Sequence, residues 1–397
     1  MVFRCLAALL LSLAFTTSAG AETVVTSTGE YPAIAVTGRG DFIAVWQETA
    51  NPTRVFARLY GANGAPKGPA FLVHDDADLG YNQAVAAGPA GRFVVVWTAD
   101  DGDQTGVFAQ RFNRNGKKLG GRIQVNSTIA GWQDSPAVAM GRDGSFVVAW
   151  RDSPIHPSGI KAQRFSAAGT REGAELAMDL QKAPYSGPFV AVDPEGFSIG
   201  WTERTPPEDR HDKRDTVPVV ARFTPEGQPV AAPDFRLSDG VDDGNGWTLN
   251  GLDSSAAGAV ALLGGNRNSV QLFSPDGDPA GPRAIVGKRA PCLPDSGWCE
   301  SAVTTAMDSS GRFAIVWLVS RTQGTGATAV RTTDLLAQLF DAKGQPLGGR
   351  VQVNRDYEGR LDGIAALSDG GVLTLLWGGR RPNSSEDKLV FRQVRLQ

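Results

Sequence analysis

The sequence predicts an all-β fold, a seven-bladed β-propeller of four-stranded antiparallel blades. Three observations support this prediction. An apolar run ending in tryptophan recurs along the chain, both faces of that run are apolar, and the two ends of the chain hold complementary parts of one repeat. With 48 glycines and 24 prolines, the chain also supplies the frequent turns that many short strands require.

The recurring run reads GRFVVVW at 91–97, GSFVVAW at 144–150 and GRFAIVW at 311–317. Its tryptophans are Trp46, Trp97, Trp150, Trp201, Trp317 and Trp377. They are separated by 51, 53, 51, 116 and 60 residues, and the gap of 116 is two periods of 58 with Leu263 in the tryptophan position. Periods near this length are typical of propeller blades. The units are expected at residues 31–80, 81–131, 132–184, 185–246, 247–297, 298–356 and 357–397, the last completed by 22–30.

Each unit is expected to hold four strands. In the third unit they are expected at 136–140, 145–150, 160–165 and 175–180. The second strand places Phe146, Val148 and Trp150 on one face and Val147 and Ala149 on the other, because side chains alternate along a strand. Since both faces are apolar, both must be covered. This favours blades packed face to face around an axis.

The third strand of most units reads ARLY, AQRF, ARF or AQLF and is followed by a turn that ends in glycine. Glycine is expected there because the hairpin needs a residue that adopts positive φ without strain. These glycines are Gly64, Gly116, Gly169, Gly227 and Gly344.

The last unit ends without a fourth strand, whereas residues 22–29, ETVVTSTG, match the fourth strands IQVNST and VQVNRD of other units. We therefore expect the N-terminal strand to complete the last blade and close the ring, which removes the free sheet edges. An open β-solenoid is the alternative, but its terminal half-units would have no reason to complement each other.

The pattern F-V-V-x-W, A-Q-R-F-x-x-x-G, L-G-G-x-I-Q-V-N resembles the imperfect repeats of exported bacterial propeller proteins, including adhesin-like and calcium-binding surface proteins. The resemblance covers almost the whole chain after residue 21, and the fifth unit departs most from it. It implies export and a β-repeat fold. It implies no activity, because the matched residues are core and turn positions.

Residues 1–21 are expected to be a secretory signal peptide, with a basic start, an apolar run from Leu6 to Phe15 and a small-residue cleavage site at Ala19-Gly20-Ala21. Residues 22–397 are then one domain without a transmembrane segment, either periplasmic or secreted. In an oxidising compartment Cys292 and Cys299 are expected to form a disulfide. The net charge of −3, with both signs interspersed, argues against a nucleic-acid partner, and we expect a monomer.

The loops of a propeller separate onto two faces. The turns after the first and third strands share one face, here short and uniform, which we call the turn face. The other connections are long and varied and share the opposite face, the variable face, where binding is expected. An aromatic residue precedes the first strand of every unit, either filling gaps between blades, which the sequence favours, or stacking on a sugar or apolar ligand at the channel mouth. These residues are Tyr31, Tyr81, Trp132, Tyr185, Trp247, Trp298 and Tyr357.

No cofactor is expected, with calcium as the alternative because aspartates cluster in several loops. The clusters are Asp75, Asp76 and Asp78; Asp100, Asp101 and Asp103; and Asp239, Asp242 and Asp243. None fits the EF-hand loop pattern, so solvated turns are the favoured interpretation. The histidines His74, His156 and His211 are expected in variable-face loops, and no catalytic partner pattern accompanies them.

The expected function is binding of a protein or a glycan through the variable face. The alternatives are a hydrolase or lyase that acts on a polysaccharide or ester through loop carboxylates, and a structural surface or matrix component. The innermost strands offer only Asp253 and Asp362 near their ends, in different blades. Glycoside hydrolysis needs two carboxylates that face one another, so the sequence favours binding over catalysis.

Overall fold

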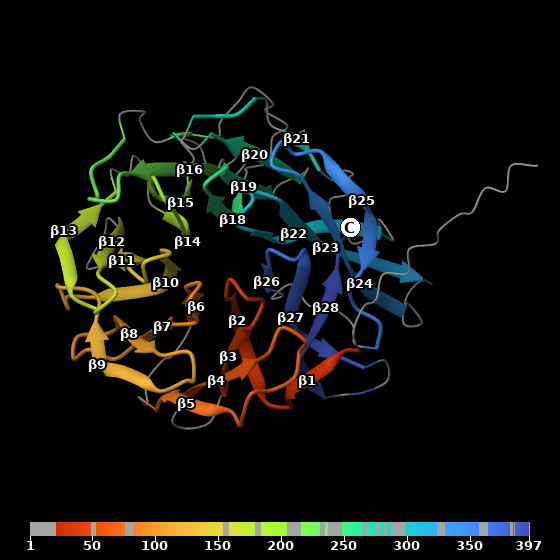
Figure 1. The fold of residues 1–397 in the computed structure, drawn as a ribbon, viewed down its shortest axis with the longest axis horizontal. Coiled ribbons are helices and arrows are strands. Elements are labelled where there is room, and N and C mark those ends of the chain that lie inside the picture. The colour runs from red at the N-terminus through yellow and green to blue at the C-terminus, as the bar shows by residue number, and fades with distance from the viewer. Residues whose placement is uncertain are drawn as a thin grey trace, which may run out of the picture.

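The computed structural model confirms the predicted architecture. It describes residues 21–48, 53–75, 83–153, 159–178, 184–204, 216–230, 235–236, 248–264, 268–274, 276, 278–281, 284–286, 298–323, 330–356, 364–381, 384 and 386–396. In these residues seven four-stranded antiparallel sheets form a seven-bladed β-propeller without helices. Figure 1 shows the sheets arranged as a ring. No helix that could span a membrane occurs in the part of the chain that the structure describes.

Each blade contributes one strand to each of four layers, from the hub outward. The innermost strands are β2 (Gly29–Val36), β6 (Ala84–Ala87), β10 (Trp132–Met140), β14 (Pro184–Asp193), β18 (Thr248–Ser255), β22 (Trp298–Met307) and β26 (Ile364–Leu367). The second strands are β3 (Phe42–Glu48), β7 (Phe93–Ala99), β11 (Phe146–Ser153), β15 (Gly196–Arg204), β19 (Gly258–Gly264), β23 (Phe313–Gln323) and β27 (Val372–Arg380). The third strands are β4 (Arg54–Tyr60), β8 (Gly106–Phe112), β12 (Gly159–Phe165), β16 (Thr216–Phe223), β20 (Ser269–Phe273), β24 (Val330–Phe340) and β28 (Asp387–Arg395). The outermost strands are β5 (Phe71–His74), β9 (Lys118–Gln124), β13 (Arg171–Ala177), β17 (Phe235–Arg236), β21 (Ala284–Ile285), β25 (Pro346–Gln352) and β1 (Thr23–Thr26).

The N-terminal strand closes the ring, as the sequence predicts. β1 pairs with β28, Thr23 opposite Phe391 and Val24 opposite Val390, so the last sheet has the order β1-β28-β27-β26. The Glu22 carboxylate also accepts a hydrogen bond from the backbone N–H of Asp356, 2.7 Å away. An open solenoid is therefore excluded.

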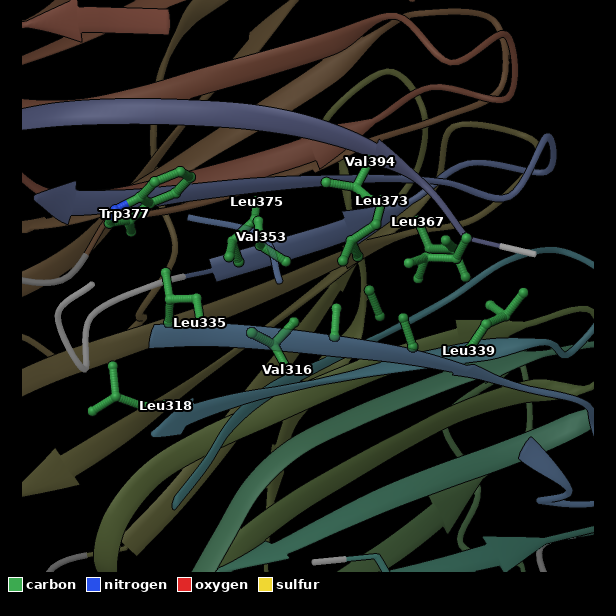
Figure 2. Close-up of a cluster of buried hydrophobic side chains, with 14 of the residues drawn as sticks. Val316, Leu318, Leu335, Leu339, Val353, Leu367, Leu373, Leu375, Trp377 and Val394 are labelled. Carbon is green, nitrogen blue, oxygen red and sulfur yellow. The ribbon is translucent and has the colours of Figure 1, made fainter. Parts of the chain in front are cut away.

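The hydrophobic core lies between blades, with one cluster of buried side chains for each neighbouring pair. In the third blade, Phe146, Val148 and Trp150 pack against the second blade, whereas Val147 and Ala149 pack against the fourth. Figure 2 shows the equivalent cluster between the sixth and seventh blades. The two-sided apolar strand of the sequence is thus a strand buried on both faces.

The recurring Gln of the AQRF pattern donates hydrogen bonds across a bulge between the third and fourth strands. In the second blade the pairing shifts register between Ala109 and Arg111. There the Gln110 side-chain amide donates to the Arg111 carbonyl at 3.0 Å and the Gly120 carbonyl at 3.3 Å, and Gly120 has a φ of 73°. In three other blades, a glutamine of the third strand also donates its side-chain amide to a glycine carbonyl of the same blade. These glutamines are Gln163, Gln271 and Gln338. The repeat therefore encodes a bulge and its hydrogen-bond partner.

Candidate functional site

Four of the seven predicted aromatic residues have a described backbone, and all four lie within the innermost strands instead of in the loops before them. Tyr31 lies in β2, Trp132 in β10, Tyr185 in β14 and Trp298 in β22. Trp132 pairs with Ser153 and Trp298 with Arg321, whereas Tyr31 and Tyr185 lie at shifts of register. They therefore do not form one ring of equivalent positions. Tyr81, Trp247 and Tyr357 lie outside the described residues.

Trp132 and Tyr31 are the exposed aromatic residues of the described variable face. Trp132 is 46% exposed and Tyr31 is 45% exposed, so each residue keeps a large part of its surface in contact with solvent. Because side chains alternate along strands, Trp132, Asp134, Arg151 and Ser153 lie on the same face of the β10–β11 pair. We call these four residues the Trp132 patch.

A bidentate ion pair lies in the Trp132 patch. The Arg151 guanidinium donates to the two carboxylate oxygens of Asp134 at 2.9 Å (Nε to Oδ1) and 2.7 Å (Nη2 to Oδ2). Both side chains keep contact with solvent, since Arg151 is 36% and Asp134 22% exposed. The patch thus combines an apolar ring with charged hydrogen-bonding groups that have a defined orientation.

A buried hydrogen-bond network holds the backbone of Trp132. Gln133 is fully buried, its N–H donates to the Thr105 carbonyl at 2.9 Å, and its side-chain amide donates to the Ala130 carbonyl at 2.8 Å. Asn126 donates to the Gln133 side-chain oxygen at 3.1 Å and accepts from the Val107 N–H at 2.8 Å. The loop between the second and third blades is therefore organised before any ligand arrives.

Asp100 and Asp101 of the 100–103 loop accept hydrogen bonds from nearby groups of the protein. Asp101 accepts hydrogen bonds from the side-chain amides of Gln124 at 3.2 Å and Asn126 at 3.1 Å, and Asp100 accepts from the Gly102 N–H at 2.7 Å. No group of three or more His, Cys, Asp or Glu residues able to hold a metal occurs among the described residues. Asp76, Asp78, Asp239, Asp242 and Asp243 lie outside those residues, as does Cys292, so calcium binding and the disulfide stay predictions.

The expected loop position of His74 is wrong. His74 ends strand β5, is 6% exposed and stacks on Trp97 of the next blade, with ring centroids 4.3 Å apart. Burial, together with the positive charge of Arg122, lowers the pKa of His74 to about 4. A neutral, buried ring of this kind is a core residue. His156 and His211 lie outside the described residues.

A cavity of about 370 Å³ opens on the turn face near the hub and is lined by residues of the third, fourth, fifth and sixth blades, a site that the sequence analysis did not predict. Its lining includes Met140, Val192, Ser255 and Met307. Asp193 and Asp308 also line it, and each carboxylate is paired with an arginine at 2.7 Å, Asp193 with Arg222 and Asp308 with Arg312.

Asp253 precedes Ser254, another residue of the cavity lining. Burial raises the pKa of Asp253 to about 7. The sequence named this residue only as an isolated acid of the innermost strands. The sequence signal that could have identified it is that the fifth unit has an aspartate where the other units have an alanine in the innermost strand.

No family model matches the sequence, and no curated protein sequence matches it. Solved propeller structures are similar in fold. A PL25 ulvan lyase bound to -[GlcA(1-4)Rha3S]- is 10% identical, with 93% of this chain and 95% of that chain covered and a TM-score of 0.55. The GH93 α-L-arabinofuranosidase of Fusarium graminearum with arabinobiose is 10% identical over 95% and 98% of the two chains, with a TM-score of 0.50. The WD40 repeats of RRP9 are 10% identical over 95% and 96%, with a TM-score of 0.52. At these identities the comparisons establish the fold alone.

Proposed function

We propose that this chain is an exported glycan-binding propeller module that holds a saccharide on the Trp132 patch of its variable face. One observation carries the proposal. An indole ring that is 46% exposed lies on the same strand pair and the same face as a solvent-accessible, bidentate Arg–Asp pair.

This combination suits the chemistry of a sugar ring. A pyranose has an apolar face of C–H groups that stacks on an aromatic ring, and its equatorial hydroxyls both donate and accept hydrogen bonds. The Asp134 carboxylate accepts such bonds and the Arg151 guanidinium donates them. Because the ion pair fixes both groups, binding would cost little side-chain entropy.

A protein partner fits the described surface less well. A stable protein interface buries about 800 Å² on each partner, with aromatic and apolar side chains at its centre. In the described part of the chain the exposed large apolar residues are few and dispersed among four blades: Val24, Tyr31, Leu72, Ile129 and Trp132. Similar solved propellers include a lyase and a glycosidase with saccharides bound, which supports the scaffold as compatible with glycan recognition.

The test is affinity electrophoresis of the purified chain through gels that contain neutral or acidic polysaccharides. Trp132→Ala is expected to weaken retention by about two- to tenfold, since an aromatic contact contributes roughly 0.5–1.5 kcal/mol. Leu72→Ala, which removes an exposed apolar side chain from the first blade, is the matched control and is expected to bind normally. Equal retention of wild type and Trp132→Ala would contradict the proposal, and release of unsaturated or reducing ends would favour the lyase or hydrolase alternative.

A further inference from the structure

The fifth blade differs from the other six at one hub position. This position is defined by backbone pairing. The second strand of each blade has a first core residue, such as Phe146 in the third blade. The hub position is the residue of the innermost strand that pairs with the next residue along, such as Val147. In six blades it is alanine: Ala35 opposite Ile43, Ala86 opposite Val94, Ala139 opposite Val147, Ala191 opposite Ser198, Ala306 opposite Ala314 and Ala366 opposite Thr374. In the fifth blade it is Asp253, opposite Val260. The structure thus places a carboxyl group where the repeat otherwise has a methyl group.

The equivalent residues show which way this carboxyl points. Ala35, Ala86 and Ala306 each belong to the buried cluster shared with the following blade. Asp253 of β18 therefore faces the sixth blade, and Ser255, two residues later in the same strand, shares that face.

The sixth blade places a second polar residue at the same boundary. Residues one position before the hub alanine, such as Ile34 and Leu252, pack against the preceding blade. The equivalent residue of β22 is Thr305, which is buried and faces the fifth blade. By this register Asp253, Ser255 and Thr305 all face the boundary between the fifth and sixth blades, and we call them the hub seam.

The oxygens of the hub seam are arranged to accept hydrogen bonds. The Thr305 hydroxyl already donates to the Ala314 carbonyl at 3.1 Å, so its lone pairs remain. The Ser255 hydroxyl accepts from the Ala257 N–H at 3.1 Å. Asp253 makes no hydrogen bond or ion pair with any residue that the structure describes, and a half-buried carboxylate without a donor is unfavourable.

The charged groups around β18 do not satisfy Asp253. On β14, Asp193 is paired with Arg222 of β16, and after β22, Asp308 is paired with Arg312. On β12, Arg164 donates to the Pro225 carbonyl of the fourth blade. Arg142 is the other cation of the cavity lining, and none of the described residues forms an ion pair with Asp253.

The cavity on the turn face adjoins one end of the hub seam, and Asp253 and Thr305 are not part of its lining. Ser255 and Met307, which belong to the two strands of the hub seam, line it, as do Met140 and Val192 of the third and fourth blades. Its volume of about 370 Å³ is in the range of small-molecule sites. Apolar walls beside a group of hydrogen-bond acceptors suit a ligand with a hydrocarbon part and a positively charged donor.

We propose that the hub seam and the adjoining cavity bind a small organic primary amine, whose ammonium group lies against Asp253, Ser255 and Thr305 and whose hydrocarbon part lies between Met307 and Met140. An ammonium group has three N–H donors, which matches the three acceptor residues of the seam. The site lies on the face opposite the Trp132 patch and is independent of the proposed function.

The charge requirement makes binding depend on pH. The unliganded carboxyl of Asp253 has a pKa of about 7, because burial disfavours its charged form. Amine binding needs the carboxylate, so affinity is expected to increase as the pH rises from 6 to 8, and the bound ammonium is expected to lower the pKa of Asp253.

The experiment is calorimetric titration of the full chain with hexylamine at pH 8, with hexanol as the uncharged probe of the same shape. Hexylamine is expected to bind at least tenfold more tightly than hexanol, and at least tenfold more tightly at pH 8 than at pH 6. Asp253→Asn is expected to abolish that preference for the amine. Asp253→Ala, which restores the residue of the other six blades and so preserves folding, is expected to do the same.

Trp132→Ala is the matched control and is expected to bind hexylamine as wild type does, so a failure of the glycan proposal leaves this result unaffected. Three outcomes would overturn the amine site: hexylamine that produces no saturable heat, hexanol that binds equally well, or folded Asp253→Ala that binds hexylamine with unchanged affinity.

Discussion

The imidazole of His74 stacks on the indole of Trp97 across the boundary between the first and second blades, with 10° between the ring planes. Burial is the main reason that the pKa of His74 falls to about 4, the Arg122 and Lys118 charges lower it further, and the Asp75 carboxylate opposes them. A protonated ring at this place would lose solvation and lie near the positive charges of Arg122 and Lys118.

Stability is therefore expected to fall as the medium is acidified. The unfolded chain binds a proton on His74 near pH 6.5, whereas the folded chain does so near pH 4, so between these values the unfolded state binds more protons. The free energy of unfolding should decrease by about 3 kcal/mol from pH 6.5 to pH 4 through this group alone. Urea titrations of wild type and His74→Phe measure it. The difference between the two proteins should change across that window, and a constant difference would show that His74 is not the responsible group.

Asp253 is expected to act in the opposite direction. Its folded pKa of about 7 lies above the ordinary value of 3.8, so the folded state binds more protons and stability decreases as the pH rises between these values. Asp253→Ala should be more stable than wild type at pH 8, by up to about 4 kcal/mol, and should lose that advantage near pH 4. Thermal unfolding at both pH values checks this. A destabilised variant at pH 8 would indicate that the carboxylate has a partner in the protein.

Much of the fold could be predicted from the sequence because it depends on local periodicity. Trp97 and Trp150 mark the same buried position in successive blades, and alternation along strand 145–150 requires two covered faces. Ring closure was also readable, since residues 22–29 match the fourth strand that the last unit lacks. Such features repeat, so each copy confirms the others.

The candidate sites could not be predicted in the same way because they break the repeat. The relation of Trp132 to Arg151 depends on a cross-strand register, and Asp253 is exceptional only when its pairing with Val260 is compared with the other blades. His74 was misplaced because its strand, FLVH, is only four residues long and runs into an acidic segment. Short outer strands carry too little periodicity to separate them from loops.

The glutamine that spans the third-to-fourth strand bulge is expected to be a major stabilising residue. Gln163 is 1% exposed, and its amide donates to the carbonyls of Arg164 at 2.9 Å and Glu172 at 3.3 Å. Gln163→Ala should remove this donor from the partly buried Arg164 carbonyl and lower the free energy of unfolding by about 1–3 kcal/mol. Gln163→Glu should be worse, since it brings a negative charge to the same carbonyls. Urea unfolding checks both, with half-buried Glu172→Gln on the neighbouring strand as the control, and an unchanged midpoint for Gln163→Ala would show that the bulge does not need the amide.

Although β1 has only four residues, its closure of the ring is expected to contribute strongly to the stability of the protein. Removing residues 22–26 would expose the edge of β28 and take away Val25, which packs against the cluster between the first and seventh blades. An exposed edge strand pairs with other chains, so the truncated protein should unfold at a lower temperature and also self-associate. Val25→Asp keeps the backbone pairing but places a charge against that cluster, so it should lower the melting temperature without self-association. Calorimetry and size-exclusion chromatography separate the two effects. A truncated chain that melts with wild type and stays monomeric would mean that β1 covers the edge without holding the ring closed.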